Sequence, residues 1–341
     1  MKISYMRIGI LGGGGCILMF LLQCGCGQPA STRRGAEAKE GQTMKGAGKG
    51  DIIASNAFFY YKDLKAAAQF YNDVLGLNTV ADYGFAKILR VARTSYLTLV
   101  DVQSGMHSAD EPKTVALALI TDQLEEWYQY LKQENVPMRS EYNPVEGRPH
   151  HGFVVYDPEG YYLEFERFNP HPENERLLPM LAAAESLYPE QGASTRCPAA
   201  LGFKATVLWL YYRDLPRIQD FWGGVMGFDQ VVDQGWAKIY AVSPTGFVGP
   251  VDGAKGMHAW TEKKGVTVSF VTNSLDGWFA HLKSQSRFEL RTPAIEEEKR
   301  AGVRVFVGYD PEGYYLEFDS FLDKQGNETL LSILKEIAAR N

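Results

Sequence analysis

Hydrophobic and polar positions along the chain predict short strands and helices in an order that occurs twice. In the first occurrence, an aromatic strand over 57–61 precedes a helix whose apolar positions recur at helical spacing up to Gly76. Asp63 stands where its side chain can cap that helix. A second helix is expected over 123–134, and further strands are expected over 86–91, 96–100, 115–120, 152–156 and 161–167.

An internal repeat organises most of the chain. The stretch YDPEGYYLEF stands at 156–165 and returns unchanged at 309–318. Its Asp-Pro-Glu-Gly segment predicts a tight turn between two strands, since Asp-Pro favours turn initiation and Gly accepts a positive φ. Other matching pairs keep one constant spacing, among them Tyr60 with Tyr211, Lys87 with Lys238, His107 with His258 and Trp127 with Trp278. A unit of about 120 residues is the size of a domain rather than of a solenoid repeat.

The first residues have the features of an export signal. Lys2 and Arg7 precede an apolar run over 8–22, which is followed by Cys24 and Cys26. The cysteines resemble the lipobox of a bacterial lipoprotein, so either is a candidate lipidation site that would anchor the protein in the cell envelope. A cleaved signal without lipid, giving a periplasmic or secreted protein, and an uncleaved anchor remain alternatives. We expect the signal over 1–26 and a flexible linker over 27–51.

Net charge and cysteine content argue against a nucleic-acid partner, a disulfide and a zinc cluster. The net charge of −6 and the pI of about 5.6 argue against a nucleic-acid partner. Once the signal cysteines are set aside, Cys197 is the free cysteine expected in the mature globular part, which predicts no disulfide and no zinc cluster there.

The order of elements and the repeated words resemble the vicinal oxygen chelate superfamily of glyoxalases, extradiol dioxygenases and antibiotic-resistance binders. The words are Tyr-Lys-Asp-Leu after the first strand, Phe-Tyr before Leu-Gly, and Asp-Pro-Glu-Gly before Leu-Glu-Phe. The resemblance implies an α+β fold of two tandem βαβββ modules, which pair within the chain as curled mixed sheets with helices outside. We place the modules at 52–168 and 203–320, a connecting helix and loop at 169–202 and a C-terminal helix at 321–341.

The resemblance also implies a candidate metal site. Metal-using relatives carry a glutamate after the Asp-Pro-x-Gly hairpin, which falls on Glu164 and Glu317 here. Strand alternation puts Glu164 on the cup side, because Leu163 and Phe165 face the helices. The positions where the family carries histidine ligands hold Asn56, Val207, Val115 and Val266. A divalent metal ion is therefore one alternative, and carboxylates that only accept hydrogen bonds are the other.

The candidate substrate-binding residues are aromatic or polar side chains on the expected cup faces. They are Asn56, Tyr60, Tyr162, His107, His151, Trp209 and Tyr211. We expect Asn56, Tyr60 and Glu164, together with His107 or His151, to converge on one cup of the first module. A poorer, more apolar cup is expected around Tyr211 and Glu317. Core packing for the aromatic residues and loop contacts for His107 remain the competing interpretations.

Three function classes follow. The first is an exported glyoxalase- or dioxygenase-like protein that binds a small molecule in a cup, as a metal-dependent lyase or dioxygenase. The second is a metal-independent small-molecule binding or sequestering protein. The third is an envelope interaction scaffold. The fold alone does not choose among them.

Overall fold

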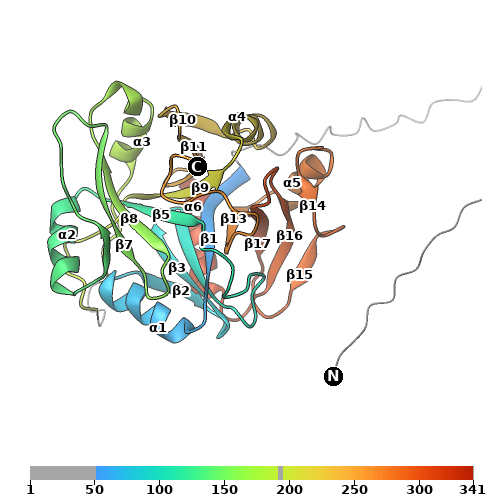
Figure 1. Cartoon of the computed structure of the whole chain (residues 1–341). Coiled ribbons are helices and arrows are strands. Elements are labelled where there is room, and N and C mark those ends of the chain that lie inside the picture. Colours follow the sequence, from blue (N-terminus) through green and yellow to red (C-terminus); the bar gives the residue numbers. More distant parts are fainter. Residues whose placement is uncertain (1–50, 191–194, 341) are drawn as a thin grey trace, which may run out of the picture. The chain divides into compact units, whose positions relative to one another are not determined.

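A computed structural model describes residues 51–190 and 195–340 of the chain (Figure 1). The predicted signal and lipobox, with Cys24 and Cys26, lie outside these residues, as does the predicted linker except Asp51. Within the described part, no helix is both long enough and apolar enough to cross a membrane.

Two mixed sheets form the framework. Sheet A runs in the order β14 (Glu289–Leu290), β16 (Val303–Tyr309), β17 (Tyr315–Phe321), β13 (Val266–Thr272), β1 (Ile52–Tyr61), β4 (Ser95–Asp101), β3 (Ala86–Ala92) and β2 (Asn78–Asp82), with β15 (Glu296–Glu298) also on β16. Sheet B runs in the order β10 (Asp229–Asp233), β11 (Lys238–Ser243), β12 (Gly246–Asp252), β9 (Ala205–Tyr212), β5 (Val115–Ile120), β8 (Tyr162–Phe168), β7 (His150–Tyr156) and β6 (Met138–Ser140). The predicted α+β class with two modules is confirmed.

Each sheet takes strands from both repeats. Sheet A joins β1–β4 of the first repeat to β13–β17 of the second, through the antiparallel pair β1–β13. Sheet B joins β5–β8 of the first repeat to β9–β12 of the second, through the antiparallel pair β5–β9. In Figure 1 the blue strand β1 accordingly lies beside the orange β13, and β5 lies beside the yellow-green β9. Neither sheet belongs to a single repeat.

Two threonines mark an approximate two-fold relation between the repeats. Thr94 and Thr245 are equivalent residues, 151 positions apart, and their hydroxyl oxygens lie 2.8 Å from each other. The backbone N–H of Thr94 donates to the Thr245 hydroxyl at 2.8 Å, and the N–H of Thr245 donates to the Thr94 hydroxyl at 2.9 Å. Contacts of this reciprocal kind arise where a two-fold axis passes between equivalent residues.

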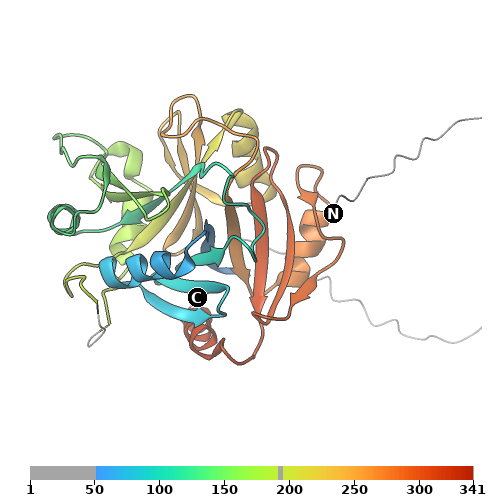
Figure 2. The same ribbon diagram turned by 60° about the horizontal axis from the view of Figure 1, so that its bottom comes forward.

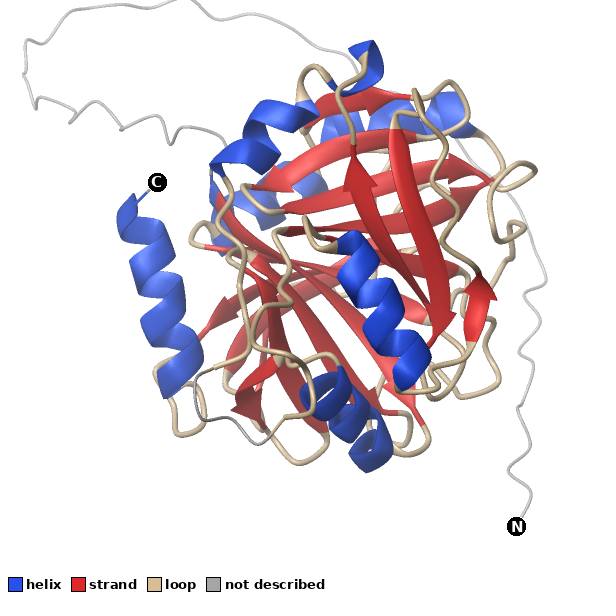
Figure 3. Cartoon of the chain, turned by 90° about the vertical axis from the view of Figure 1, so that its left-hand side faces the viewer, coloured by secondary structure: helices blue, strands red, loops and turns tan. Residues whose placement is uncertain are grey.

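Helices cover the sheet faces that carry the largest core (Figure 3). They are α1 (Leu64–Gln69), α2 (Leu124–Gln133), α4 (Leu215–Gln219) and α5 (Leu275–Lys283). Asp63 caps α1 as predicted, since its carboxylate accepts from the Ala66 N–H at 2.9 Å. Helices α1 and α4 each continue into a π-helical turn, at Phe70–Val74 and Asp220–Val225.

Two further helices pack on the opposite sheet faces. Helix α3 (Leu177–Ala183), which follows a 3-10 turn at Pro172–Asn174, buries Leu177 and Leu181 against the cluster of sheet B. Helix α6 (Glu328–Arg340) places Leu330, Leu334 and Ile337 in the cluster of sheet A, and lies beside that sheet in Figure 2. Each helix occupies part of the hollow of its sheet, leaving the remainder as the candidate site.

The repeated decapeptide ties the two repeats together. Buried Asp157 orders the turn, since its carboxylate accepts from the backbone N–H groups of Glu159 and Tyr161 at 3.0 and 2.8 Å. Gly160 follows with a φ of 91°, a value that favours glycine. The Tyr161 hydroxyl then donates to the Gly265 carbonyl, in the other repeat, at 2.7 Å. Its equivalent Tyr314 donates to the Thr114 carbonyl at 2.9 Å.

Candidate functional site

We define cup A as the face of sheet A opposite helices α1 and α5, and cup B as the corresponding face of sheet B. Cup A holds a cavity of about 630 Å³. Its walls come from β1, β3, β4, β15, β16 and β17, with a loop at 104–106 on one side. The apolar wall residues are Phe58, Tyr83, Phe85, Ile88, Val100, Val303, Val305 and Phe321. A cavity of this size and lining suits a small organic molecule.

The centre of cup A is polar and internally hydrogen-bonded. The hydroxyl oxygens of Tyr60, on β1, and Thr267, on β13, lie 2.6 Å apart. Asn56 donates through Nδ2 to the Thr98 hydroxyl at 2.9 Å. Strand alternation places these side chains on one face, because Asn56 and Tyr60 share the register of Phe58 on β1. Burial raises the pKa of Tyr60 well above its ordinary value, so its hydroxyl stays protonated.

Two acidic side chains of β17 face the cavity of cup A. Glu317 and Asp319 are separated by one residue and both line the cavity. Ser269 donates to Asp319 Oδ2 at 2.5 Å, while the buried Oδ1 atom has no hydrogen-bond donor among the described residues. Burial raises the pKa of Asp319 to about 6, and burial together with the Asp319 charge raises the pKa of Glu317 well above its usual range.

Aromatic and basic groups lie around these carboxyl groups. Arg291 donates to the Tyr315 hydroxyl at 2.7 Å, and both residues line the cavity. His107 packs edge-on against Tyr60 and Tyr315, with ring centroids 4.9 and 5.9 Å away. Its Nδ1 atom lies 2.5 Å from Glu111 Oε2. Burial lowers the pKa of His107, which favours the neutral ring.

Cup B is filled by its own side chains. The Trp209 ring lies against the backbone of Gly249, so close that a Cβ added at Gly249 would stand 2.1 Å from a ring carbon. His258 stacks on Tyr162 with centroids 4.1 Å apart and meets Tyr211 edge-on at 5.0 Å. The Trp209 ring therefore occupies in cup B the space beside Gly249, where cup A has the smaller Phe58 ring beside Thr98.

Cup B also carries a carboxyl pair, and this pair has an internal cation. Glu164 and Glu166 are the equivalents of Glu317 and Asp319 on β8. His150 Nδ1 lies 2.7 Å from Glu166 Oε1, and the Glu166 charge raises the pKa of His150 to about 9. Burial raises the pKa of Glu164 to about 8.

The contrast between the cups follows from a few substitutions between equivalent positions. Four polar residues of cup A are replaced by smaller or apolar residues in cup B. The pairs are Asn56 with Val207, Thr98 with Gly249, Thr267 with Ala116 and Ser269 with Ala118. Phe58 of cup A corresponds to Trp209, the residue that fills cup B.

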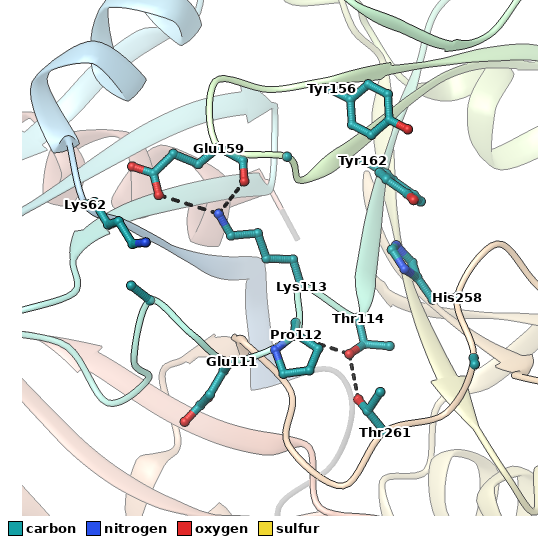
Figure 4. Close-up of a pocket in the computed structure, with 13 residues that line it drawn as sticks. Lys62, Glu111, Pro112, Lys113, Thr114, Tyr156, Glu159, Tyr162, His258 and Thr261 are labelled. Carbon is teal, nitrogen blue, oxygen red and sulfur yellow. Dashed lines mark hydrogen bonds and ion pairs between the residues drawn. The ribbon is translucent and has the colours of Figure 1, made fainter.

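A second hollow lies at the surface beside cup B. This groove of about 810 Å³ runs between the connecting segment 109–114 and the loop around His258 (Figure 4). Lys113, which points across the groove in Figure 4, donates to the Glu159 carbonyl at 2.6 Å, and the Thr114 and Thr261 hydroxyls lie 2.7 Å apart. Because these polar groups are already satisfied by each other, the groove is a weaker candidate than cup A.

The expectation that Glu164 and Tyr60 share one cup is wrong. Tyr60, Asn56 and His107 lie at cup A, whereas Glu164 lies in cup B. The predicted candidates Tyr162, Trp209 and Tyr211 accompany Glu164 there, and Glu317 is the glutamate of cup A. The cause is the pairing of β1 with β13 rather than with β5. Glu317, which was predicted for the poorer and more apolar cup, in fact lines the open cavity of cup A.

The prediction that His151 faces the cup is also wrong. His150, not the predicted His151, faces the hollow of sheet B. His151 points to the other side of the strand, and its Nε2 atom lies 2.8 Å from the Val145 carbonyl oxygen. The sequence missed Asp319, Arg291 and Thr267 as site residues. The Glu-x-Asp spacing on a strand was the available signal for Asp319.

The donor set of cup A does not fit the metal centre that the resemblance implies. Asn56 stands at an expected histidine position and is hydrogen-bonded to Thr98, whereas Val266, at the other, packs in the core on the helix-covered face of sheet A. Across residues 51–190 and 195–340, no three His, Cys, Asp or Glu side chains are grouped to hold a metal ion. The carboxyl groups of Glu317 and Asp319 have no imidazole grouped with them, since His107 is paired with Glu111, and two carboxyl groups alone are a poor site for a transition metal.

Comparison with known proteins agrees with this fold. Residues 54–165 match the Glyoxalase/Bleomycin resistance protein/Dioxygenase superfamily. A glyoxalase I mutant from Zea mays superposes with a TM-score of 0.53 at 15% identity, covering 83% of this chain and 94% of that one. A Bacillus subtilis protein named "putative dioxygenase" superposes with a TM-score of 0.53 at 14% identity, covering 86% and 96%. No curated protein matches the sequence.

The family match covers residues 54–165, most of the first repeat, and the superposed glyoxalase and dioxygenase structures show that the described part of this chain has the same fold. At such low identities the superposed structures define the fold and leave the ligand open.

Proposed function

We propose that the protein binds a small organic molecule in cup A. The observation that carries this proposal is the contrast between equivalent sites: cup A keeps a cavity of about 630 Å³, while Trp209 lies over Gly249 in cup B. A cavity that combines aromatic walls with a few convergent polar groups is the usual form of a ligand site. Tyr60, Glu317 and Asp319 are the polar groups that would orient the ligand.

The proposed activity is binding without a metal. Of the predicted classes, the metal-dependent lyase or dioxygenase would need a donor set that Asn56 and Val266 do not provide. The scaffold class leaves the cavity of cup A without a role. Binding or sequestration of a small molecule uses the cavity and the residues that line it.

Ligand-observed NMR with 1-naphthalenemethanol as the probe tests this proposal. The variant Phe58→Trp/Thr98→Gly transfers the filling of cup B into cup A and is expected to abolish the saturation-transfer signal. The mirror variant Trp209→Phe/Gly249→Thr alters only cup B and should keep the signal. Val305→Trp is a second, single-site filling of cup A, in case the double variant folds poorly. An unchanged signal in folded cup A variants, or no signal with the unmodified protein, would refute the proposal.

We also propose that the chain is exported and anchored by lipid in a bacterial envelope. Lys2, Arg7, the apolar run 8–22, and Cys24 or Cys26 support this proposal. Mass spectrometry of the full chain expressed in a bacterial host should find a mature amino terminus carrying lipid. An unprocessed chain with unmodified cysteines would contradict it.

A further inference from the structure

The two carboxyl groups of cup A hydrogen-bond to each other, and burial raises the pKa of both without a basic side chain to counteract it. Asp319 is 1% exposed and lines the cavity, and its hydrogen-bond partners are the Ser269 hydroxyl and the Glu317 carboxyl group. Glu317 lies beside it on the same face of β17. A buried carboxylate is costly unless a cation or hydrogen-bond donors meet it.

In cup B the equivalent carboxyl pair has a cation from the protein itself, although Glu166 Oε2, like Asp319 Oδ1, has no hydrogen-bond partner among the described residues. There the equivalent acid, Glu166, lies 2.7 Å from His150, whose ring carries the compensating positive charge. His150 stands on β7 opposite Phe168, one strand away from the two glutamates. The cation belongs to the protein, and Trp209 fills the remaining space.

Cup A lacks this histidine. Val303 occupies the equivalent position, opposite Phe321 on β16, and its side chain lines the cavity. Three basic residues lie in the cavity wall: Arg291 bonds to Tyr315, Arg300 bonds to Glu298 and stacks on Phe85, and Lys299 is exposed. None of them is among the groups that shift the pKa of Glu317 or Asp319. The position in cup A that corresponds to the His150 ring of cup B therefore holds an apolar side chain, which faces the cavity.

We propose that cup A selects an organic cation, a protonated amine carried on an aromatic or apolar body. This inference rests on the proposed function of cup A and specifies its ligand class. The ammonium N–H groups would donate to Glu317, the more exposed member of the pair, and the buried Asp319 behind it would add its negative charge, in the role that Glu166 has toward His150 in cup B. The body of the ligand would lie against the apolar wall residues Phe58 and Val303.

Calorimetric titration of the full chain with three isosteric probes tests this inference. The probes are (1-naphthyl)methylammonium, neutral 1-naphthalenemethanol and the anion 1-naphthoate. We expect the cation to bind at least about tenfold more tightly than the alcohol, and the anion to bind most weakly. Equal affinity for cation and alcohol would overturn the inference while leaving cup A as a binding site. If none of the three binds, both proposals fail.

Variants then assign the preference to the carboxyl pair. Val303→His places the cup B cation in cup A, and is expected to weaken the cation about tenfold while the alcohol changes less than about twofold. Val303→Leu is the size control and should change the affinity of both probes by less than about twofold. Asp319→Asn should reduce the preference for the cation, whereas His150→Val, in cup B, should leave it intact. A preference that persists in both Val303→His and Asp319→Asn contradicts the inference.

Discussion

The hydroxyl groups of Tyr60 and Thr267 lie 2.6 Å apart at the centre of cup A, although the residues are 207 positions apart in the chain. This hydrogen bond joins β1 of the first repeat to β13 of the second repeat. The equivalent residues of cup B are Tyr211 and Ala116, and Ala116 has no hydroxyl group to offer. The polar centre is therefore a property of one cup and depends on the exchange of strands between repeats.

The first prediction concerns this hydrogen bond. Thr267→Ala gives cup A the residue of cup B and leaves the buried Tyr60 hydroxyl without its partner. We expect the free energy of unfolding to fall by about 1–2 kcal/mol in urea titrations. Tyr60→Phe should cost a similar amount, and the double variant should cost less than the sum of the two. Strict additivity would show that the two hydroxyls do not interact.

The second prediction concerns the tyrosines of the repeated decapeptide. Tyr161→Phe removes the donor to the Gly265 carbonyl and the acceptor for the Tyr60 N–H, both buried. Urea unfolding should show a loss of about 1–3 kcal/mol. Tyr314→Phe should behave alike, because it serves the same role at Thr114. Tyr188→Phe, at an exposed position, is the control and should be neutral. Neutral Tyr161→Phe would contradict the tie between repeats.

The third prediction concerns pH and the His150–Glu166 ion pair. The pKa of His150 is raised in the folded protein to about 9, from an ordinary 6.5, so folding favours the protonated ring. The stabilisation is therefore fully present below about pH 6.5 and is lost as the pH rises through about 9. His150→Val should lower the free energy of unfolding by about 1–3 kcal/mol at pH 6, and by clearly less at pH 10.

His151→Val is the matched control for that measurement, since His151 lies on the other side of the same strand. Its effect on the free energy of unfolding should lack the decline between pH 6.5 and 9. If His150→Val lowers the free energy of unfolding by the same amount across this pH range, the His150–Glu166 ion pair does not stabilise cup B.

The fourth prediction concerns the filling of cup B. Gly249→Ala places a Cβ atom where the Trp209 ring lies, and we expect a loss of about 1–3 kcal/mol from overpacking. Adding Trp209→Phe should recover part of this loss, because the smaller ring leaves space for the methyl group. Thermal or urea unfolding of the single and double variants measures it. A neutral Gly249→Ala would mean that the ring moves aside easily and that cup B can open.

The sequence predicted the helices, most strands and the direction of their side chains, because these depend on local periodicity, but it missed the short strands β2 and β6. It did not predict which strands meet. Strands β5 and β13 occupy the same position in the two repeats, so each has the pattern required to pair with β1. Periodicity determines the face on which Glu164 lies, and the long-range pairing determines its neighbours.

A usable signal for the pairing was nevertheless present in the polarity of equivalent positions. Thr267 and Ser269 on β13 match the polar Asn56 and Thr98 of the first repeat. Ala116 and Ala118 on β5 instead match the apolar face of β9, with Val207 and Trp209. Buried polar groups require partners, so this matching favours the exchanged sheets over sheets made from one repeat each. The contrast between His150 in cup B and Val303 in cup A depends on which strands form each cup, so sequence periodicity alone did not predict it.

A crystal structure of the protein soaked with (1-naphthyl)methylammonium tests the central claim most directly. We predict density for the naphthyl group in cup A, between Phe58 and Val303, with the ammonium nitrogen within hydrogen-bonding distance of Glu317 or Asp319. Cup B should stay filled by Trp209, in the same conformation as before the soak. Density for the probe in cup B or in the surface groove beside Lys113, with cup A empty, would contradict the account.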